Sequence, residues 1–151
     1  MGKKFGPQPV PFYPSNPDKY TGTYPIISRS KWETSAMRYF DRCSSCLSWG
    51  SESAVVRYYD PVKQKERRYF IDFTATFKVK DGSTQKFYIE VKPHRETIQP
   101  KQTKRKKAST FLLESNKWHT NCAKWDAAHK WAKTRGATFL ILTEKDLYFD
   151  K

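Results

Sequence analysis

The chain has 151 residues, and its 29 Lys and Arg against 15 Asp and Glu give a net charge of +14. This length fits one domain with a single core, and the charge calls for a polyanionic partner, with nucleic acid as the first candidate. A membrane is excluded as that partner, because no apolar run approaches the roughly 18 residues that span a bilayer. The N-terminus also leads into no apolar signal segment, so a cytosolic protein is expected.

Residues 1–25 hold six of the nine prolines, which predicts an extended arm with neither helix nor strand pairing. Residues 26–151 then form a single domain. The arm either lies along that domain or docks into a partner through its aromatic side chains, which are Phe5, Phe12, Tyr13, Tyr20 and Tyr24.

A helix is predicted to begin at Ser30, because Ser30 and Glu33 have the spacing of a capping box. Residues 44–50 mark its exit. Its buried face is predicted to carry Trp32, Ala36, Phe40 and Cys43. Glu33 either only caps this helix or takes part in a site.

Three β-prone segments follow, at residues 53–59, 68–79 and from 85 onward. Polar turns separate them, and Asp81-Gly82 has the form of a hairpin turn. We therefore expect an antiparallel three-strand meander.

The third of these strands carries a carboxylate and an ammonium on one face. Alternation places Phe87, Ile89 and Val91 in the core, while Tyr88, Glu90 and Lys92 are expected to look outward. Two charges on a strand that is otherwise buried indicate an ion pair, a metal site or a wet cleft.

A basic loop is predicted at residues 94–110, directly after Pro93. It is expected to bind DNA phosphates without reading sequence. Its candidate contacts are Lys101, Lys104, Arg105, Lys106 and Lys107.

A second helix is predicted from Asn116 to Arg135, with Gly136 as its stop and a short apolar strand at residues 138–143. A strand, helix, strand order implies a parallel fourth strand. The fold class is therefore α/β, with a mixed sheet flanked by two helices. On the second helix, Lys124 lies beside an apolar stripe of Trp118, Cys122, Trp125, His129 and Ala132.

Asp72 lies in the second strand, and antiparallel pairing can bring it beside Glu90. Two carboxylates and the Val91 carbonyl suit Mg²⁺, with Mn²⁺ as a substitute. Such a site could hydrolyse a phosphodiester, with Lys92 orienting water and steadying the developing charge. Glu33 would complete the metal shell or support a second ion.

A zinc site is the alternative metal centre. Cys43-x-x-Cys46 and His119-x-x-Cys122 have the spacing of two half-sites. Against it, Cys43 and Cys122 fall on the apolar faces of the predicted helices, where free cysteine behaves as a small hydrophobe.

Through Ile71-Asp72 and Ile89-Glu90-Val91-Lys92, the chain resembles the PD-(D/E)XK nuclease superfamily. Ile71 replaces the proline that often precedes the Asp, at a position with no chemical role. Over most of its length the chain resembles the head completion nucleases of T-even-like tailed phages, and more distantly the endonuclease subunit of heteromeric bacterial transposases. The segments that carry this closer resemblance are Ser28-Arg29-Ser30-Lys31-Trp32-Glu33, Trp49-Gly50-Ser51-Glu52, Arg68-Tyr69-Phe70-Ile71-Asp72-Phe73, Ile89-Glu90-Val91-Lys92-Pro93, Ala123-Lys124-Trp125 and Leu142-Thr143-Glu144.

The resemblance implies a restriction-endonuclease-like core, a catalytic acid at Glu33 and a phosphate contact at Lys124. It also implies action on packaged DNA ends before tail joining, with virion head, portal or tail proteins as partners. The protein would then be found in the virion and the host cytoplasm. Two other functions stay open, a non-catalytic DNA-binding virion protein and a repair or junction-resolving nuclease.

Overall fold

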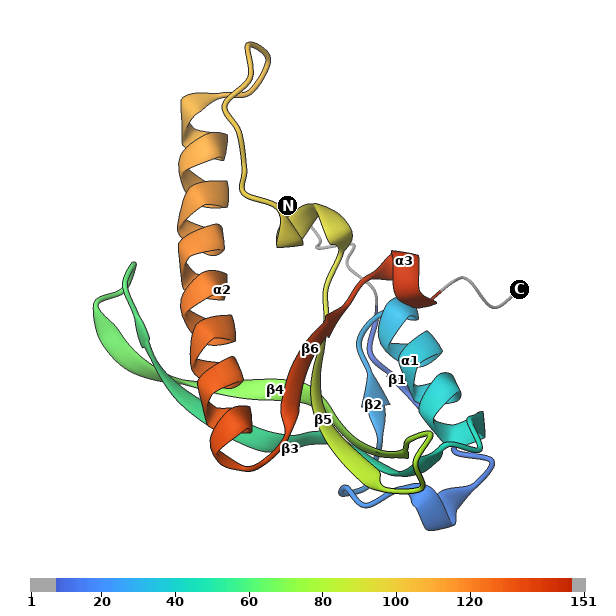
Figure 1. Cartoon of the computed structure of the whole chain (residues 1–151). Coiled ribbons are helices and arrows are strands. Elements are labelled where there is room, and N and C mark those ends of the chain that lie inside the picture. The colour runs from blue at the N-terminus through green and yellow to red at the C-terminus, as the bar shows by residue number, and fades with distance from the viewer. Residues whose placement is uncertain (1–7, 148–151) are drawn as a thin grey trace.

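A four-stranded sheet organises residues 8–147, which this computed structural model describes (Figure 1). Its strands, in spatial order, are β3 (Cys46–Asp60), β4 (Lys65–Lys78), β5 (Thr84–Val91) and β6 (Thr138–Leu142). The first three pair antiparallel and β6 pairs parallel to β5. The predicted α/β class, the meander and the parallel fourth strand are all confirmed.

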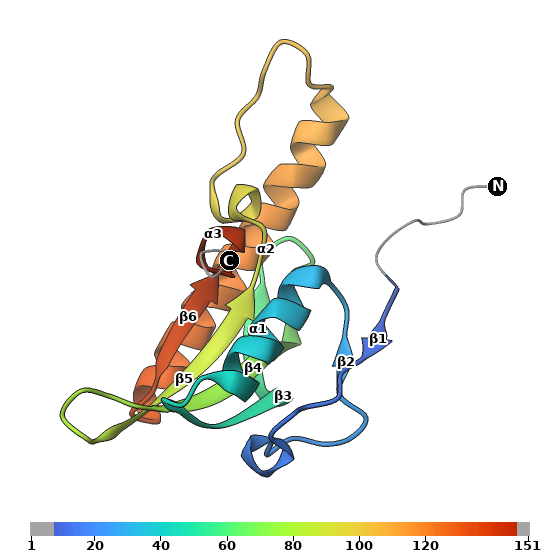
Figure 2. The same cartoon turned by 90° about the vertical axis from the view of Figure 1, so that its right-hand side faces the viewer.

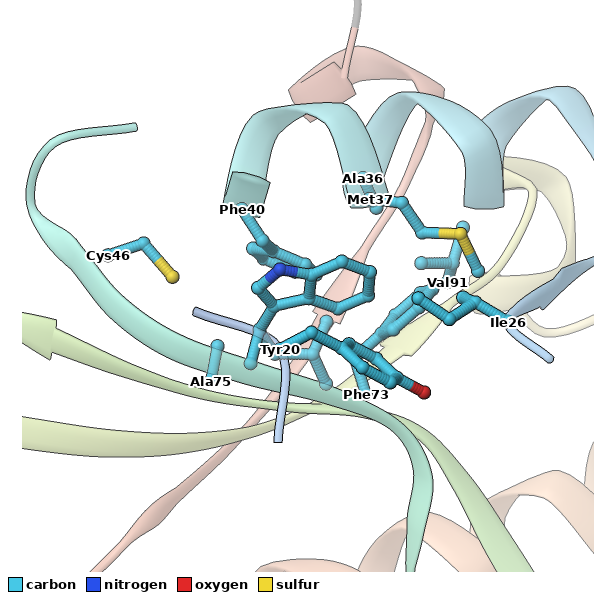
Figure 3. Packing of buried hydrophobic residues seen from close by; sticks show 11 residues of the cluster. Tyr20, Ile26, Ala36, Met37, Phe40, Cys46, Phe73, Ala75 and Val91 are labelled. Atoms are coloured by element: carbon cyan, nitrogen blue, oxygen red, sulfur yellow. The ribbon is translucent and has the colours of Figure 1, made fainter. Parts of the chain in front are cut away.

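One face of the sheet is covered by α1 (Lys31–Arg42). The helix begins where the capping box predicts, since the Glu33 N–H donates to Ser30 Oγ at 3.0 Å. Beneath it, Phe40 packs edge-on against Phe73 and tilted against Trp49, with ring centroids 5.4 and 5.9 Å apart (Figure 3). This aromatic layer fixes the helix over the middle of the sheet.

The opposite face is covered by the C-terminal half of α2 (Ala108–Thr134), whose buried residues are Asn121, Trp125, Ala128 and Ala132. The helix ends at Thr134, and Gly136 follows with a φ of +68°, the left-handed conformation that glycine favours. No helix within residues 8–147 is both long and apolar enough to cross a membrane.

The N-terminal arm folds back along the domain. A two-residue ladder joins β1 (Val10–Pro11) to β2 (Ile27–Ser28), and a 3₁₀ turn, η1, spans Pro17–Lys19. Tyr20 is buried and packs against Trp49 with a centroid distance of 4.7 Å. The prediction of neither helix nor pairing in this arm was therefore wrong. Phe5 lies outside the described residues.

Two predicted boundaries were also wrong. β3 begins at Cys46 rather than residue 53, so Trp49 and Gly50 lie within a strand. α2 begins at Ala108 rather than Asn116, which shortens the basic loop. The first part of α2 buries no residue and projects beyond the sheet together with residues 98–107 (Figures 1 and 2). We call this projecting part the overhang.

Two short elements complete the described chain. The 3₁₀ helix η2 (His94–Thr97) follows β5, and α3 (Glu144–Leu147) follows β6. The His94 N–H donates to Glu144 Oε1 at 2.7 Å, which ties the two together at one end of the sheet.

Candidate active site

β4 separates from β5 at Asp72. The ladder between these strands ends at the pair Phe73 and Ile89. Beyond it, the Val91 N–H donates to Asp72 Oδ2 at 2.8 Å, so a side chain takes the place of a backbone carbonyl. The carboxyl of Asp72 is thereby fixed at the C-terminal end of β5.

The same face of β4 also contacts two different hydrophobic clusters on either side of Asp72. Tyr69, Ile71 and Phe73 are each two residues apart along β4, so a flat strand would place them on one face. Tyr69 and Ile71 nevertheless pack in the cluster under α2, whereas Phe73 packs in the cluster under α1. Opposite them, β3 is irregular between Ser51 and Ala54. Bulges of this kind increase strand twist, and here the twist leaves Asp72 between the two layers.

Asp72 and Glu90 form a pair of adjacent carboxyl groups. Continuing the β4–β5 register by one residue puts them opposite each other. Glu90 is only 5% exposed, because α2 covers its face, and Tyr88 is buried in the same way. The prediction that these two side chains look outward was therefore wrong.

The charged form of Asp72 is disfavoured at this position. Burial first, and then the charge of Glu90, raise the pKa of Asp72 well above its usual range, while the Val91 N–H acts in the opposite direction. Glu33 raises the pKa of Asp72 further. A buried carboxyl pair of this kind suits a divalent cation with oxygen ligands.

Lys92 lies within ion-pair distance of the carboxyl pair. Its Nζ is 3.8 Å from Glu90 Oε2 and 4.0 Å from Glu96 Oε1. Glu96 also pairs with Lys117 at 2.9 Å. Sequence analysis missed Glu96, and its i, i+4 spacing from Lys92 is the signal that could have found it.

Lys124 reaches toward the site from α2. Its Nζ lies 5.5 Å from the centre of the Tyr69 ring. Burial, followed by the charge of Lys92, lowers the pKa of Lys124, while Glu90 acts in the opposite direction. The ammonium therefore lies in the electrostatic field of both members of the Glu90–Lys92 pair.

Tyr69 and Trp125 add two polar atoms that sequence analysis missed. The Tyr69 hydroxyl and Trp125 Nε1 are buried, and neither has a hydrogen bond of normal geometry within residues 8–147. Burial, and then the charge of Glu90, raise the pKa of Tyr69. Strand alternation places Tyr69 away from Asp72, so only the change of layers explains its position here.

Glu33 both caps α1 and lies in the field of the site. Its Oε1 accepts the Arg29 N–H at 3.0 Å. Burial raises the pKa of Glu33, the Arg29 N–H and charge lower it, and the charges of Glu52 and Glu90 raise it again. The two roles weighed from the sequence are therefore compatible.

The lysine-bearing part of the basic loop, residues 101–107, forms the tip of the overhang (Figure 1). At 1.5 Å per residue, the start of α2 lies about 25 Å along the helix axis from Lys124. Lys106 Nζ pairs with Glu114 at 2.7 Å and donates to the Lys101 carbonyl at 2.6 Å. Of the phosphate contacts predicted in this loop, those that are exposed are Lys101, Lys104, Arg105 and Lys107.

The structure does not assemble the zinc alternative. Cys43 and Cys46 pack under α1, whereas His119 and Cys122 belong to α2 on the other face of the sheet. Within the described part of the chain, no three His, Cys, Asp or Glu side chains are grouped closely enough to hold a metal ion. A cation at the carboxyl pair would thus have two carboxylates and the Val91 carbonyl as its protein ligands.

Comparisons with known proteins agree with this geometry. A family model for the TnsA-like endonuclease N-terminal domain matches residues 43–144. That range contains Asp72, Glu90, Lys92 and Lys124 but not Glu33. The chain is also 38% identical over 138 residues to the head completion nuclease of Enterobacteria phage T4, covering 89% of each protein. These matches confirm the resemblance found in the sequence motifs.

Proposed function

The chain belongs to the family of TnsA-like endonuclease domains, and from this premise we propose that it is a divalent-cation-dependent DNA endonuclease. The observation that carries the proposal is the carboxyl pair. Glu90 is buried and Asp72 is partly exposed beside it, and burial together with the Glu90 charge disfavours the charged form of Asp72.

Each protein group has a separate task in phosphodiester hydrolysis. The carboxylates of Asp72 and Glu90, with the Val91 carbonyl, would hold Mg²⁺ or Mn²⁺. A bound ion of this type polarises the phosphate and makes water more acidic. The Lys92 ammonium, 3.8 Å from Glu90, orients the attacking water and steadies the charge that develops on the phosphate.

DNA is held through its phosphates. Lys124 contacts the backbone beside the scissile bond, and the exposed cations of the overhang bind it farther along the duplex. Contacts to phosphates carry no information about the bases, so we expect binding that is independent of sequence.

The proposed biological role is that of the relative. The phage T4 protein is a head completion nuclease, and a match over 89% of both chains supports the same role here. The protein would act on packaged DNA ends, in the virion and in the host cytoplasm. It would contact head, portal or tail proteins.

Incubation of supercoiled plasmid with the protein tests the activity. We expect nicked or linear DNA with Mg²⁺ and none with EDTA. Lys92→Ala should lower the cutting rate at least about 100-fold while leaving DNA binding nearly unchanged. Lys86→Ala, an exposed lysine on the same strand, is the matched control. Intact plasmid under conditions of clear binding would make the protein a non-catalytic DNA-binding virion component.

A further inference from the structure

A cavity of about 480 Å³ lies beneath the overhang, between α2 and the segment that follows β5. The helix contributes Lys117, Trp118 and Asn121 to its wall, and the segment contributes Glu96, Ile98 and Pro100. None of the groups assigned above to phosphodiester hydrolysis lines it. The cavity is therefore a feature separate from the carboxyl pair.

Hydrogen bonds hold the loop over this cavity in place. Gln102 Nε2 donates to the Lys106 carbonyl at 2.8 Å, and Lys106 Nζ donates to the Lys101 carbonyl at 2.6 Å. The Lys106–Glu114 ion pair joins the same loop to α2. The cavity is thus preformed, as binding sites for small planar groups commonly are.

The wall combines an aromatic ring with an unused amide. Asn121 is only 4% exposed, and no hydrogen bond joins its carboxamide to another residue of the described chain. The Asn121 amide is not among the fully buried unpaired polar atoms of residues 8–147, and as part of the cavity wall it can offer its donors and its acceptor to a ligand. Trp118, Ile98 and Pro100 supply apolar contact around it.

A nucleobase has the matching chemistry, because it presents an apolar ring face and a polar edge. Aromatic side chains stack on unpaired bases, and Asn hydrogen-bonds their edges. Arg95 and Lys117 lie at the same cavity and can pair with the attached phosphate. A paired base inside a duplex presents neither of its ring faces, so the fit is to an unpaired nucleotide.

The cavity adjoins the carboxyl pair through one residue. Glu96 lines the cavity, and its Oε1 is 4.0 Å from Lys92 Nζ, which in turn is 3.8 Å from Glu90. A nucleotide held beneath the overhang would place a neighbouring phosphate near Asp72 and Glu90. We infer that this cavity binds one unpaired nucleotide of the DNA substrate and selects DNA with unpaired bases beside the cut. This inference rests on the proposed nuclease function.

Binding to two DNAs without divalent cation tests the inference. One is a fully paired duplex, and the other is the same duplex with a short single-stranded end that carries 2-aminopurine. Since stacking contributes about 1–3 kcal/mol per base, we expect the second to bind about 5- to 150-fold more tightly, with a changed 2-aminopurine fluorescence. Trp118→Leu and Asn121→Leu should each reduce that preference, while Lys130→Ala, on the exposed face of α2, should preserve it.

Thermal unfolding of each variant establishes that it is folded before its binding is compared. Equal affinity of the wild type for both DNAs would overturn the inference, as would a preference that survives in both folded cavity variants. Unchanged 2-aminopurine fluorescence in a bound complex would also overturn it and would assign the cavity to another occupant, such as a peptide. A preference that depends on Trp118 and Asn121 would support the inference even if the plasmid assay showed no cutting, which would overturn only the nuclease function.

Discussion

Asp72 serves the strand and the site at once, since one of its oxygens accepts the Val91 N–H while its charge faces Glu90. Asp72→Asn retains an acceptor for that N–H and removes the charge. The variant should therefore lose cutting and yet, without divalent cation at neutral pH, unfold at a higher temperature than the wild type.

The pH dependence of this difference has a defined sign. The pKa of Asp72 is higher in the folded than in the unfolded protein, so the folded state binds this proton more tightly. Stability of the cation-free wild type should fall as pH rises from the unfolded pKa through the folded pKa. Asp72→Asn should lessen that fall, and Mg²⁺ should raise the melting temperature of the wild type alone. Melting curves from pH 4 to 8, with and without Mg²⁺, measure both effects; curves that coincide for the two proteins would contradict them.

A substitution of Glu33 can separate its role as a helix cap from its proposed role in catalysis. Glu33→Gln retains the side-chain oxygen that accepts the Arg29 N–H. It should cost no more than the about 0.3–1 kcal/mol that an acidic charge contributes at a helix N-terminus. Cutting should nevertheless fall at least about 10-fold. A variant that cuts at the wild-type rate would leave Glu33 as a cap only; urea unfolding and plasmid cleavage give the two numbers.

Spacing along the sequence was enough to identify Asp72, Glu90 and Lys92 as candidates. Tyr69 lies near the carboxyl pair only because β4 twists from one hydrophobic cluster to the other. Strand alternation alone places Tyr69 on the face opposite Asp72. Local patterns report which residues share a face, but they do not report where a sheet twists between two layers.

The elements that sequence analysis placed well have local signals at their ends. α1 has a capping box, the β4–β5 hairpin has Asp81-Gly82, and Gly136 follows the end of α2. The start of α2 has no such signal, because Leu112 and Leu113 are 59% and 71% exposed and the first turns bury nothing. A helix is predicted from an apolar stripe along its buried face. The first turns of α2 have no buried face, so they carry no such stripe.

The overhang gives a prediction about DNA affinity. Lys104→Glu with Arg105→Glu should weaken binding to any duplex sequence, and the slope of log K against log salt should become shallower by about 2. Lys130→Glu with Lys133→Glu reverses two charges at the far end of the same helix and is the matched control. Anisotropy titrations from about 50 to 200 mM salt measure the slopes. Equal losses in the two double variants would mean that the overhang has no special part in binding.

Under the proposed function, the net charge of +14 serves DNA binding and the carboxyl pair serves cutting in one molecule. If completion of the virion requires DNA cutting, a variant that binds DNA without cutting it should not support completion. In a phage whose own copy of this gene is disabled, Asp72→Asn or Lys92→Ala supplied in trans should yield few infectious particles, whereas Lys86→Ala should restore them. Plaque counts measure this, and full restoration by the two site variants would show that only the bound protein is needed.

The hydrogen bond from Val91 to Asp72 Oδ2 leaves Oδ1 as the unengaged oxygen of that carboxylate. Asp72 would then be a one-oxygen ligand whose direction is set by the backbone of β5, while Glu90 is held beside Lys92. The Val91 amide hydrogen can exchange with deuterated water only when its hydrogen bond to Asp72 is broken, so its exchange rate reports on that bond. The protection factor of that single amide therefore measures how often the Val91–Asp72 hydrogen bond opens while the rest of the sheet stays paired.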